Sequence, residues 1–440
     1  MTATGHAGAI MGYLTDLFDR QLPLRIRVWD NSEAGPAGAV TVVLRSPNAL
    51  RYILWSPGEL GVARAYVTGE LDVVGDLEAG LSTVLAAIGG RRPRINARTA
   101  ADGARLLARL GAIGRPLPAP PSEARPRGRR HSMRRDAQVI SHHYDLSNEF
   151  YRLLLDRSMA YSCGYWTSDE PGYTVGNAQR DKLDLICRKL DLRPGARLLD
   201  IGCGWGSLTV HAAKEFGASV TAVTVAKEQR AFVADRLARE GVEHLVELRL
   251  ADYREVLAQA RGDYDAVAII EMGEHVGDDQ YPAFLAGLHA SLRDEGRFLL
   301  QVMSRGHRHP GGGPFIERYI APDMHMRPLA DTVGRVAAAG FEVRDVHVLR
   351  EHYARTIRAW HEEMERRWDE VVGLIGPEQA RVWRLYLVGG ALSFEENRMG
   401  VDQILAVRTG ARGSSGLAAT RLGWDQPAQV VTRPAVDTSG

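Results

Sequence analysis

Cysteine is scarce in this chain of 440 residues, which contains only Cys163, Cys187 and Cys203. Three scattered cysteines make neither a disulfide framework nor a zinc ribbon, and no metal site is predicted. An excess of charge of one sign is also lacking, because 55 Lys and Arg residues balance 54 Asp and Glu residues to a net charge of +1. The overall field of the protein therefore does not require a polyanionic partner.

Long apolar runs are missing as well. No stretch reaches the ~18 apolar residues of a membrane-spanning helix. The first residues, MTATGHAGAIMGYLTDLFDRQ, lack the charged start, apolar centre and cleavage site of a signal peptide. We therefore expect a cytoplasmic protein. Its length and its 45% of hydrophobic residues are enough for a sizeable core.

The chain is predicted to have four parts. Residues 1–90 mix strand-like and helical stretches and predict a small accessory α+β domain. Residues 91–136 are rich in Arg, Pro and Ala, and proline and glycine breakers argue against a packed element there. Residues 137–410 alternate strands with helices, and residues 411–440 are predicted to be a mobile tail.

Six arginines lie close together in the second part, which leaves three interpretations open. The first is a solvated linker. The second is docking to anionic lipid, where each basic residue near the surface contributes ~1 kcal/mol. The third is a nucleic-acid-binding arm, although no RNA-binding or DNA-binding motif accompanies it. The arginines are Arg125, Arg127, Arg129, Arg130, Arg134 and Arg135.

Seven apolar stretches in the third part are strand candidates, and helical stretches such as GSLTVHAAKEF lie between most of them. This alternation predicts an α/β fold, with a parallel sheet covered by helices on both faces. The long helical stretch at 354–396 would form a lid or an extra layer. The strand candidates are residues 196–202, 219–225, 246–250, 264–270, 296–304, 341–349 and 402–409.

The turn after the first of these strands has the sequence LLDIGCGWGSL (198–208). Gly202, Gly204 and Gly206 let the backbone turn sharply and let a ligand approach without a Cβ in the way. The helix that begins next offers free N–H groups at its N-terminus. Two ligand classes fit this pattern, a dinucleotide and S-adenosylmethionine.

Three details distinguish between the two ligands. A dinucleotide site prefers Gly-x-Gly-x-x-Gly and an acidic residue about 20 positions on. Here the third glycine comes one position early, the second strand ends with Thr224 instead of an acid, and Asp200 precedes the first glycine. These features favour S-adenosylmethionine, whose carboxylate and ammonium groups suit backbone amides and carbonyls. A structural turn without a ligand remains the alternative.

Further motifs flank this turn on both sides. They are HHYDLSNEFYRLLLDRSMAYSCGYW (142–166), AVTVAKEQ (222–229), ADYRE (251–255), EMGEHVG (271–277), FIERYIAP (315–322) and HYARTIRAW (352–360). Together with the glycine turn, they make the chain from His143 to about Val407 similar to the cyclopropane-fatty-acid synthase family of S-adenosylmethionine-dependent methyltransferases, which includes the mycolic acid cyclopropane synthases. The resemblance implies a class I methyltransferase with a Rossmann-like, mostly parallel seven-stranded sheet and a helical lid. The N-terminal region is similar to the accessory domain of phospholipid-acting members.

The resemblance also implies which residues hold S-adenosylmethionine. They are Tyr161 and Ser162 at its methionine part; Gly202, Cys203 and Gly204 along its back, with Asp200 and Gly206 in the same turn; Thr224 and Gln229 at its ribose; and Asp252 and Tyr253 at its adenine.

Other residues are implied to surround the reacting atoms. Cys163 would lie near the reactive carbon, and Glu274 and Tyr353 would help hold a bicarbonate ion, which serves the family as the base. Glu274 follows a buried strand, where site residues lie in open α/β sheets. His275 would support Glu274 without contacting the ion itself. The alternatives are that Glu274 caps the next helix and that Cys163 is a small buried hydrophobic residue.

The implied substrate is the cis double bond of an unsaturated acyl chain in a phospholipid. An alkene is a poor nucleophile, so proximity and alignment must do much of the work. Methyl transfer leaves a carbocation, which aromatic faces can stabilise. Loss of a proton from the new methyl group closes a cyclopropane ring, or gives a methylene branch after a hydride shift. The aromatic candidates, each with ordinary packing as the alternative, are Tyr161, Tyr165, Trp166, Tyr319 and Trp360.

Two positions depart from the family pattern. Gln301 replaces a histidine that helps to bind bicarbonate in many members, and glutamine donates a hydrogen bond but carries no proton at neutral pH. Gly390 replaces a cysteine, which rules out a cysteine nucleophile there. Altered ion binding would delay deprotonation and permit the hydride shift. We therefore expect a methylene-branched product, a precursor of tuberculostearate, with the cyclopropane product as the alternative.

The expected partners follow from this chemistry. The enzyme would meet phospholipid acyl chains by binding peripherally to the inner face of the membrane. A saturated branch would need a separate reductase, because the chain has no nicotinamide or flavin motif. No nucleic acid is expected, since residues 271–274 read Glu-Met-Gly-Glu instead of Asn/Asp-Pro-Pro-Tyr. A nucleic-acid or small-molecule methyltransferase, a dehydrogenase and a non-catalytic cofactor-binding scaffold remain as rivals, and homodimerisation stays open.

Overall fold

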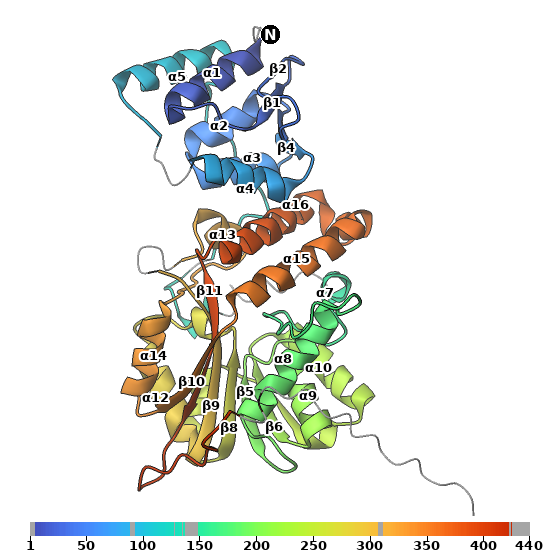
Figure 1. Ribbon diagram of the computed structural model, residues 1–440, viewed down its shortest axis with the longest axis vertical. Coiled ribbons are helices and arrows are strands. Elements are labelled where there is room, and N and C mark those ends of the chain that lie inside the picture. Colours follow the sequence, from blue (N-terminus) through green and yellow to red (C-terminus); the bar gives the residue numbers. More distant parts are fainter. Residues whose placement is uncertain are drawn as a thin grey trace, which may run out of the picture. The chain divides into compact units, whose positions relative to one another are not determined.

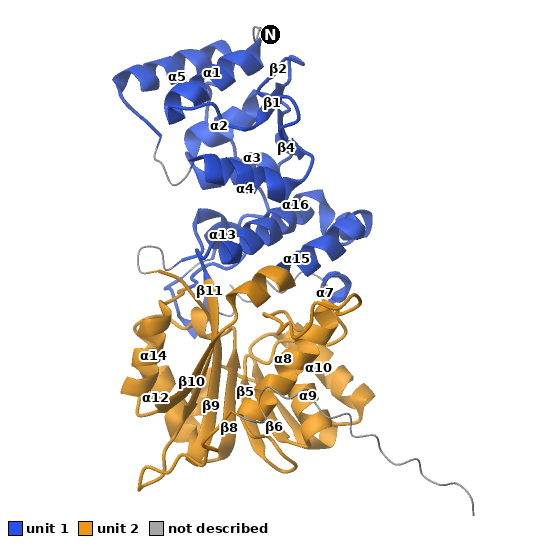
Figure 2. Cartoon of the chain, viewed as in Figure 1, with its two compact units in different colours: residues 1–154, 308–324, 357–399 blue, residues 155–307, 325–356, 400–440 orange. Residues whose placement is uncertain are grey.

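The computed structural model describes residues 5–88, 93–126, 128–133, 135–136, 148–306, 311–421 and 424. The chain forms two compact units, which Figure 2 colours separately. Unit 1 consists of Met1–Leu154, Arg308–Met324 and Ile357–Met399, and unit 2 of Leu155–His307, His325–Thr356 and Gly400–Gly440.

Unit 2 is built on a seven-stranded sheet with the order β10-β11-β9-β8-β5-β6-β7 (Figure 1). Each strand lies at one of the seven stretches predicted from the sequence, so the predicted α/β fold is confirmed. The strands are β5 (Arg197–Ile201), β6 (Ser219–Thr224), β7 (Val246–Leu250), β8 (Tyr264–Ile270), β9 (Leu292–Ser304), β10 (Glu342–Val348) and β11 (Gly400–Val407).

The order of the strands reverses at β5. This strand lies between β6 and β8 and pairs in parallel with both. β6 pairs in parallel with β7, and β8 pairs in parallel with β9. β11 runs antiparallel to its neighbours β9 and β10. The carboxyl ends of β5 to β8 therefore share one edge of the sheet, and the chain leaves β5 and β8 toward opposite sides of it.

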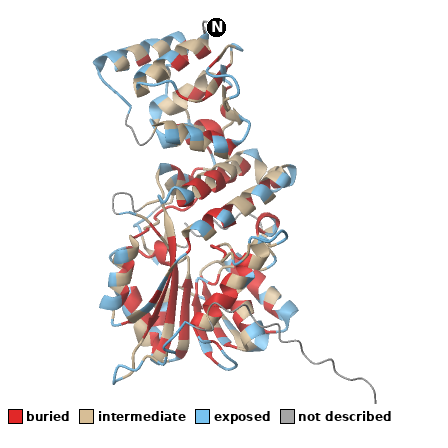
Figure 3. Cartoon of the chain, viewed as in Figure 1, coloured by how far each residue is buried: buried red, intermediate tan, exposed pale blue. Residues whose placement is uncertain are grey.

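Helices cover both faces of the sheet because its central strands are apolar on both sides. In β5, Leu199 and Ile201 pack with α11, α12 and α14, whereas Leu198 packs on the opposite face with α8, α9 and α10. Figure 3 shows the central strands as buried. The helices are α8 (Val175–Lys189), α9 (Ser207–Phe216), α10 (Lys227–Glu240), α11 (Tyr253–Gln259), α12 (Tyr281–Ser291) and α14 (Leu329–Ala338).

Unit 1 contains a second, four-stranded sheet with the order β2-β1-β3-β4. It confirms the predicted small α+β region at the N-terminus. Its strands are β1 (Arg25–Val28), β2 (Glu33–Ala34), β3 (Thr41–Leu44) and β4 (Leu71–Val74), and its helices include α1 (His6–Phe18), α2 (Pro47–Trp55), α3 (Glu59–Val67), α4 (Leu77–Ile88), α7 (Asn148–Leu154) and α13 (Pro314–Tyr319).

The prediction that residues 91–136 contain no packed element is wrong, because helix α5 (Ala97–Arg109) forms there. Asn96 and Thr99 make a capping box, in which each side chain accepts a hydrogen bond from the other residue's N–H. Leu110 is buried in the core of unit 1. Gly103 lets α1 approach, since a Cβ there would lie 2.5 Å from the Tyr13 hydroxyl. The prolines of this region flank the helix and do not interrupt it.

The arginine-rich segment is partly engaged within unit 1. Arg130 and Arg135 both form ion pairs with Asp323, at 3.1 and 2.5 Å, and the Arg135 side chain is 14% exposed. A fully solvated linker therefore does not describe these two arginines. Arg127 and Arg134 lie outside the described residues, and lipid docking by this segment stays a prediction.

Helices α15 (Arg350–Arg366) and α16 (Trp368–Glu395) occupy the range in which a lid was predicted. From Ile357 onward they belong to unit 1, because Val388 and Leu392 of α16 lie in the same core cluster as Leu44 of β3. The compact units thus divide the chain at points other than 136 and 410, and a lid role stays a prediction. Among the described residues, no helix is long and apolar enough to cross a membrane.

A buried ion pair in unit 2 generates a stability prediction. The Nζ of Lys189 lies 2.9 Å from Oδ2 of Asp345, and the two side chains are 2% and 5% exposed. We expect Asp345→Asn to lower the free energy of unfolding by about 3–5 kcal/mol in denaturant titrations, because it leaves a buried charge uncompensated. The control is Asp235→Asn, which removes an exposed pair with Arg239 and should cost less than about 0.5 kcal/mol. Equal losses would contradict the prediction.

Candidate active site

The candidate site begins at the carboxyl end of β5, where the strand order reverses. In open α/β sheets, ligands bind in the crevice outside this edge. The N–H groups of Gly202 and Cys203 both donate to the carbonyl of Val223 in β6, at 2.9 and 3.0 Å. Gly202, Gly204 and Gly206 have φ angles of 81°, 55° and 78°, which glycine adopts without a Cβ penalty.

Gly204 is the glycine of this turn that borders open space. A Cβ at Gly202 would lie 3.0 Å from Met272, and one at Gly206 would lie 3.1 Å from Val233. A Cβ at Gly204 would meet no heavy atom within 4 Å. Gly202 and Gly206 therefore allow close packing inside the protein. The open side of Gly204, next to the N-terminus of α9, fits the close approach of S-adenosylmethionine to the backbone.

Asp200, the last polar residue before the turn, faces α9. Its Oδ2 accepts a hydrogen bond from the Thr209 hydroxyl at 2.6 Å, and the side chain is 2% exposed. Burial raises the pKa of Asp200 to about 6, and the bond from Thr209 opposes this effect. Asp200 thus fastens β5 to α9 and positions the turn, and direct contact with a cofactor stays a prediction.

The next two strand ends carry the residues predicted for the ribose and the adenine. At the end of β6, the Thr224 hydroxyl donates to Oε1 of Gln229 at 2.9 Å, and both side chains are buried. After β7, Asp252 caps α11: its two carboxylate oxygens accept from the N–H and the NH1 of Arg254, each at 2.9 Å. Tyr253 begins that helix. The structure therefore brings these predicted residues to one edge of the sheet.

A buried lysine that sequence reasoning missed holds the loop before α8. Lys182 is 1% exposed, and its Nζ donates to the Ser162 hydroxyl at 2.8 Å. Burial lowers the pKa of Lys182, and the charge of Glu271 is the largest of the effects that oppose it. A lysine within a helix of mixed charge gives no sequence signal of burial.

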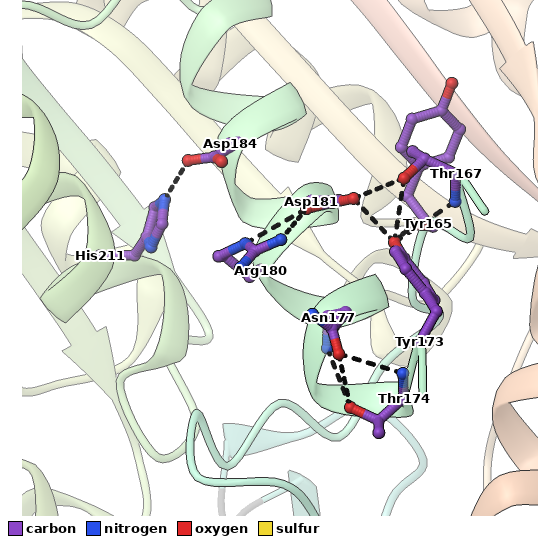
Figure 4. A network of polar contacts seen from close by, with 9 residues as sticks. All are labelled: Tyr165, Thr167, Tyr173, Thr174, Asn177, Arg180, Asp181, Asp184 and His211. Atoms are coloured by element: carbon purple, nitrogen blue, oxygen red, sulfur yellow. Dashed lines mark hydrogen bonds and ion pairs between the residues drawn. The ribbon is translucent and has the colours of Figure 1, made fainter. Parts of the chain in front are cut away.

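The same loop is tied to α8 by a network of polar contacts (Figure 4). The Asp181 carboxylate accepts hydrogen bonds from the Thr167 hydroxyl at 2.6 Å and the Tyr173 hydroxyl at 2.7 Å. Thr174 and Asn177 form a capping box at the start of the helix. The residues predicted to contact the methionine part of the cofactor therefore lie in a loop that is fixed along its length.

Helix α15 also holds this loop. The Thr356 hydroxyl accepts from the N–H of Gly164 at 3.1 Å and from Nε1 of Trp166 at 3.0 Å. The Nδ1 of His352 accepts from the Trp166 N–H at 3.0 Å. Burial lowers the pKa of His352, which keeps this nitrogen unprotonated and able to accept.

Glu271 lies at the centre of the site, directly after β8. Its Oε1 accepts hydrogen bonds from the Cys163 N–H at 2.9 Å and from Nε2 of Gln301 at 2.7 Å. Its Oε2 accepts from the Tyr353 hydroxyl at 2.6 Å. The three donors come from the loop before α8, from β9 and from α15. Sequence reasoning quoted Glu271 within a motif but assigned it no role; two glutamates three positions apart were the available signal.

Gln301 is turned toward Glu271 by a residue that was not predicted. Gln403 of β11 lies opposite Gln301 in the sheet and donates its Nε2 to Oε1 of Gln301 at 3.0 Å. The Nε2 of Gln301 is therefore the atom that faces Glu271. Both glutamines are fully buried.

Glu274 lies in the short helix η2 (Gly273–His275), and its Oε1 accepts from the Met303 N–H at 2.6 Å. Its Oε2 is buried and has no hydrogen-bond partner among the described residues. Burial, reinforced by the charge of Glu271, raises the pKa of Glu274 to about 8. The structure thus places Glu274 against β9, while Tyr353, the other residue predicted to hold bicarbonate, donates to Glu271.

Cys163 and His275 complete the predicted catalytic set. Cys163 is fully buried, and its Sγ lies 3.2 Å from the carbonyl oxygen of Gly164. Burial raises the pKa of its thiol well above the ordinary value, so the thiol is neutral. The N–H of Cys163, and not its sulfur, reaches Glu271. His275 is partly exposed at the end of η2.

The aromatic candidates divide between the units. Tyr161, Tyr165 and Trp166 belong to unit 2, and each keeps part of its surface exposed. Tyr319 and Trp360 belong to unit 1 and are 2% and 1% exposed. Ordinary packing accounts for the burial of the latter two, and a role beside a carbocation stays a prediction for the first three.

The reversed strand order at β5, the glycine turn and the polar residues at the ends of β6 and β7 define an S-adenosylmethionine-dependent class I methyltransferase. Residues 131–404 match the family described as mycolic acid cyclopropane synthetase, and the chain belongs to this family. The enzyme class and the cofactor predicted from the sequence are therefore confirmed, and the protein modifies fatty acyl chains.

Individual relatives agree with this assignment. The chain is 35% identical over 407 residues to a probable fatty acid methyltransferase of Pseudomonas putida, covering 91% of this chain and 95% of the relative. It is 31% identical over 406 residues to the tuberculostearic acid methyltransferase UfaA1 of Mycobacterium tuberculosis, covering 88% of each. Among solved structures, it is similar to the mycolic acid cyclopropane synthase CmaA1 complexed with SAH and CTAB, with a TM-score of 0.57 and 30% identity over 62% of this chain and 98% of that chain.

A matched pair of glycines tests the cofactor site. Gly204 and Gly241 both have positive φ and open space where a Cβ would stand. We expect Gly204→Ala and Gly241→Ala to lower the free energy of unfolding equally, by about 1–2 kcal/mol. Only Gly204→Ala should also weaken S-adenosylmethionine binding, by about tenfold or more in isothermal titration calorimetry, because its methyl group enters the space for the ligand. Unchanged affinity would contradict this site.

The raised pKa of Glu274 predicts a pH-dependent stability. Because the folded carboxyl has a pKa of about 8 and the ordinary value is 4.5, the folded protein binds an extra proton between these pH values. The free energy of unfolding should therefore fall as pH rises from about 4.5 to 8, by up to ~1.4 kcal/mol per pH unit. Glu274→Gln should remove the part of this slope that Glu274 contributes between about pH 6 and 8, in denaturant titrations at several pH values. Glu247→Gln, at an exposed pair with Arg249, should retain it.

Proposed function

We propose that the protein transfers a methyl group from S-adenosylmethionine to the cis double bond of an unsaturated, oleoyl-like acyl chain in a phospholipid and yields a methylene-branched chain. Two observations support this proposal. The chain is similar over most of its length to a tuberculostearic acid methyltransferase. The polar groups directly after β8 and within β9 are the carboxylate of Glu271 and the amide of Gln301, and the amide cannot carry a proton.

The residues around the glycine turn provide the cofactor site. Gly204 offers backbone without a Cβ, Ser162 lies in the loop fixed by Lys182, Thr224 ends β6 and Asp252 follows β7. Bound S-adenosylmethionine supplies an electrophilic methyl group at this site. Because the loop before α8 is hydrogen-bonded to α8 and α15, Ser162 is held in place before the substrate enters. A site that is already in place helps to align a weak nucleophile.

The substrate must be held apart from water while it carries positive charge. An alkene that accepts a methyl group becomes a carbocation on the neighbouring carbon. The partly exposed rings of Tyr161, Tyr165 and Trp166 are the candidates for the wall beside it, since an aromatic face attracts a cation. Water excluded from this wall cannot trap the cation as an alcohol.

The hydrogen bonds of Gln301 favour one of the two products. Its Oε1 accepts from Gln403 and its Nε2 donates to Glu271, so both polar atoms of the amide have hydrogen-bond partners. A histidine at this position could bind an ion and exchange a proton, whereas this amide can do neither while it keeps these bonds. Slower deprotonation gives the hydride shift time to occur before a proton leaves.

Ring closure to a cyclopropane is the second candidate. The family description and the similarity to a cyclopropane synthase favour it. Both products require the same methyl transfer and the same removal of a proton, and they differ in whether a hydride moves first.

The proposed substrate places the reaction at the inner face of the membrane, with peripheral binding of the enzyme and no nucleic acid involved. Reducing a methylene branch to a methyl branch requires a hydride donor. A separate reductase of the nicotinamide or flavin class would act on the product.

Product analysis tests the proposal. The purified protein is incubated with S-adenosylmethionine and dioleoyl phosphatidylglycerol vesicles, and the acyl chains are analysed by mass spectrometry and NMR. We expect one added carbon per modified chain and the NMR signals of an exocyclic methylene group. The two candidate products are isomers of equal mass, so NMR decides between them. Vesicles of the saturated distearoyl lipid should give no product.

A cyclopropane signal would overturn the branched product and leave the methyltransferase class intact. If the protein binds S-adenosylmethionine but adds no carbon to any unsaturated lipid, the proposed substrate is wrong.

A further inference from the structure

The donors expected to hold a bicarbonate ion are occupied by a side chain of the protein itself. The resemblance implies that Tyr353, Glu274 and the residue at 301 surround the ion. In the structure, Tyr353 and Gln301 both donate to the carboxylate of Glu271, at 2.6 and 2.7 Å. A carboxylate and bicarbonate are both planar anions with oxygens that accept hydrogen bonds. Bicarbonate therefore does not fit this cluster, because an equivalent anion already accepts its bonds.

The backbone of Glu271 is a second, independent observation. Its φ is 51°, in the left-handed region. A non-glycine residue costs roughly 1–2 kcal/mol in this conformation, and such residues persist where the surrounding structure fixes them, often at functional sites. The N–H of Glu271 donates to the carbonyl of Gln301 at 2.8 Å, which holds the strained residue at the end of β8. Glycine would adopt this conformation without cost but would provide no carboxylate.

We propose that the Glu271 carboxylate is the base of this enzyme and takes the place that a bicarbonate ion holds in the family. This inference rests on the proposed function, since it concerns the proton that leaves the methylated acyl chain. It makes catalysis independent of a dissolved ion.

The surroundings of Glu271 hold the pKa of its carboxyl above the ordinary value. Burial raises the pKa of the carboxyl, and the bonds from Tyr353, the Cys163 N–H and Gln301, together with the charge of Lys182, oppose that effect. Neighbouring Glu274 has a pKa of about 8, so its protonated form removes a like charge from beside Glu271. A carboxylate with a raised pKa is a better base than an ordinary one.

Glu271 is also the member of its cluster that keeps accessible surface. Cys163 and Gln301 are fully buried and Tyr353 is 4% exposed, whereas Glu271 is only partly buried. Part of Glu271 therefore reaches the surface, whereas its donors are buried. The proposal requires a C–H bond to approach the carboxylate and the proton to pass to water after the product leaves.

The proposed deprotonation gives a product without charge. After methyl transfer and the hydride shift, the positive charge lies on the carbon that carries the new methyl group. A carboxylate oxygen of Glu271 takes one proton from that methyl group. The electrons of the broken C–H bond form the carbon–carbon double bond of the methylene branch and cancel the positive charge. Glu271 becomes a neutral carboxylic acid, and no oxidant or reductant is consumed.

Three preparations of the full-length protein test this inference: the wild type, Glu271→Gln and Glu271→Gly. Turnover on dioleoyl phosphatidylglycerol vesicles is measured in carbon dioxide-free buffer with and without added sodium bicarbonate. The wild type should be equally active in both. Glu271→Gln keeps the shape of the side chain and should lose at least ~100-fold in turnover in both buffers. Its affinity for S-adenosylmethionine, measured by calorimetry, should stay within about twofold.

Glu271→Gly separates a catalytic role from a structural one. It fits the left-handed backbone, removes the carboxylate and frees the donors of Tyr353 and Gln301. We expect it to be inactive alone and to regain at least about tenfold in turnover with added bicarbonate, because the ion can then occupy the vacated place. Loss of a structural contact alone would not be restored by this ion. Glu247→Gln, on the exposed face of β7, is the control and should match the wild type.

Two results would overturn the inference. One is an active wild type whose turnover falls in carbon dioxide-free buffer and recovers with bicarbonate. The other is a Glu271→Gln variant that keeps more than about one third of the wild-type turnover. Both leave the proposed function standing. A wild type that modifies no unsaturated lipid in either buffer would overturn the proposed function and this inference with it.

Discussion

The geometry of the site depends on one partly buried carboxylate and its three hydrogen-bond donors. An ionised carboxylate away from water is costly unless it is paired, and Glu271 is bound by the Cys163 N–H, Gln301 and Tyr353. These donors lie in the loop before α8, in β9 and in α15, which are far apart in the chain. One side chain therefore fixes three segments at a common point, and the donors lose their partner if it is removed.

The electrostatics of the site follow from crowding several ionisable groups into a space with little water. Lys182 is the buried cation near Glu271, and burial lowers its pKa while the surrounding acids oppose that effect. Burial raises the pKa values of Asp200 and Glu274. The two carboxyl groups thus have pKa values of about 6 and about 8, and their neutral forms limit the cost of burial. The same property is useful in a reaction that must collect a proton.

The sheet supplies the frame on which these groups are placed. Its central strands are apolar on both sides, so helices seal both faces and leave the carboxyl edge for the polar groups. Glycine at 202 and 206 allows the turn to pack against Met272 and Val233, and glycine at 204 leaves the backbone accessible. The helices after Ile357 instead join the core of the N-terminal region, so the catalytic sheet and these helices belong to different compact units.

The sequence by itself determined the seven strands, the glycine turn and the family, because each is written in local patterns: alternation of apolar stretches, three glycines at fixed spacing and motifs in a set order. It misjudged α5, whose Asn96–Thr99 cap outweighed the surrounding prolines. Only the tertiary structure decided that Glu271, and not Glu274, receives the bonds from Tyr353 and Gln301, and that Gln403 and Lys182 support the site. Two glutamates three positions apart look alike in a sequence. What distinguishes them is the left-handed backbone at Glu271 and the side chains that distant strands and helices bring to it.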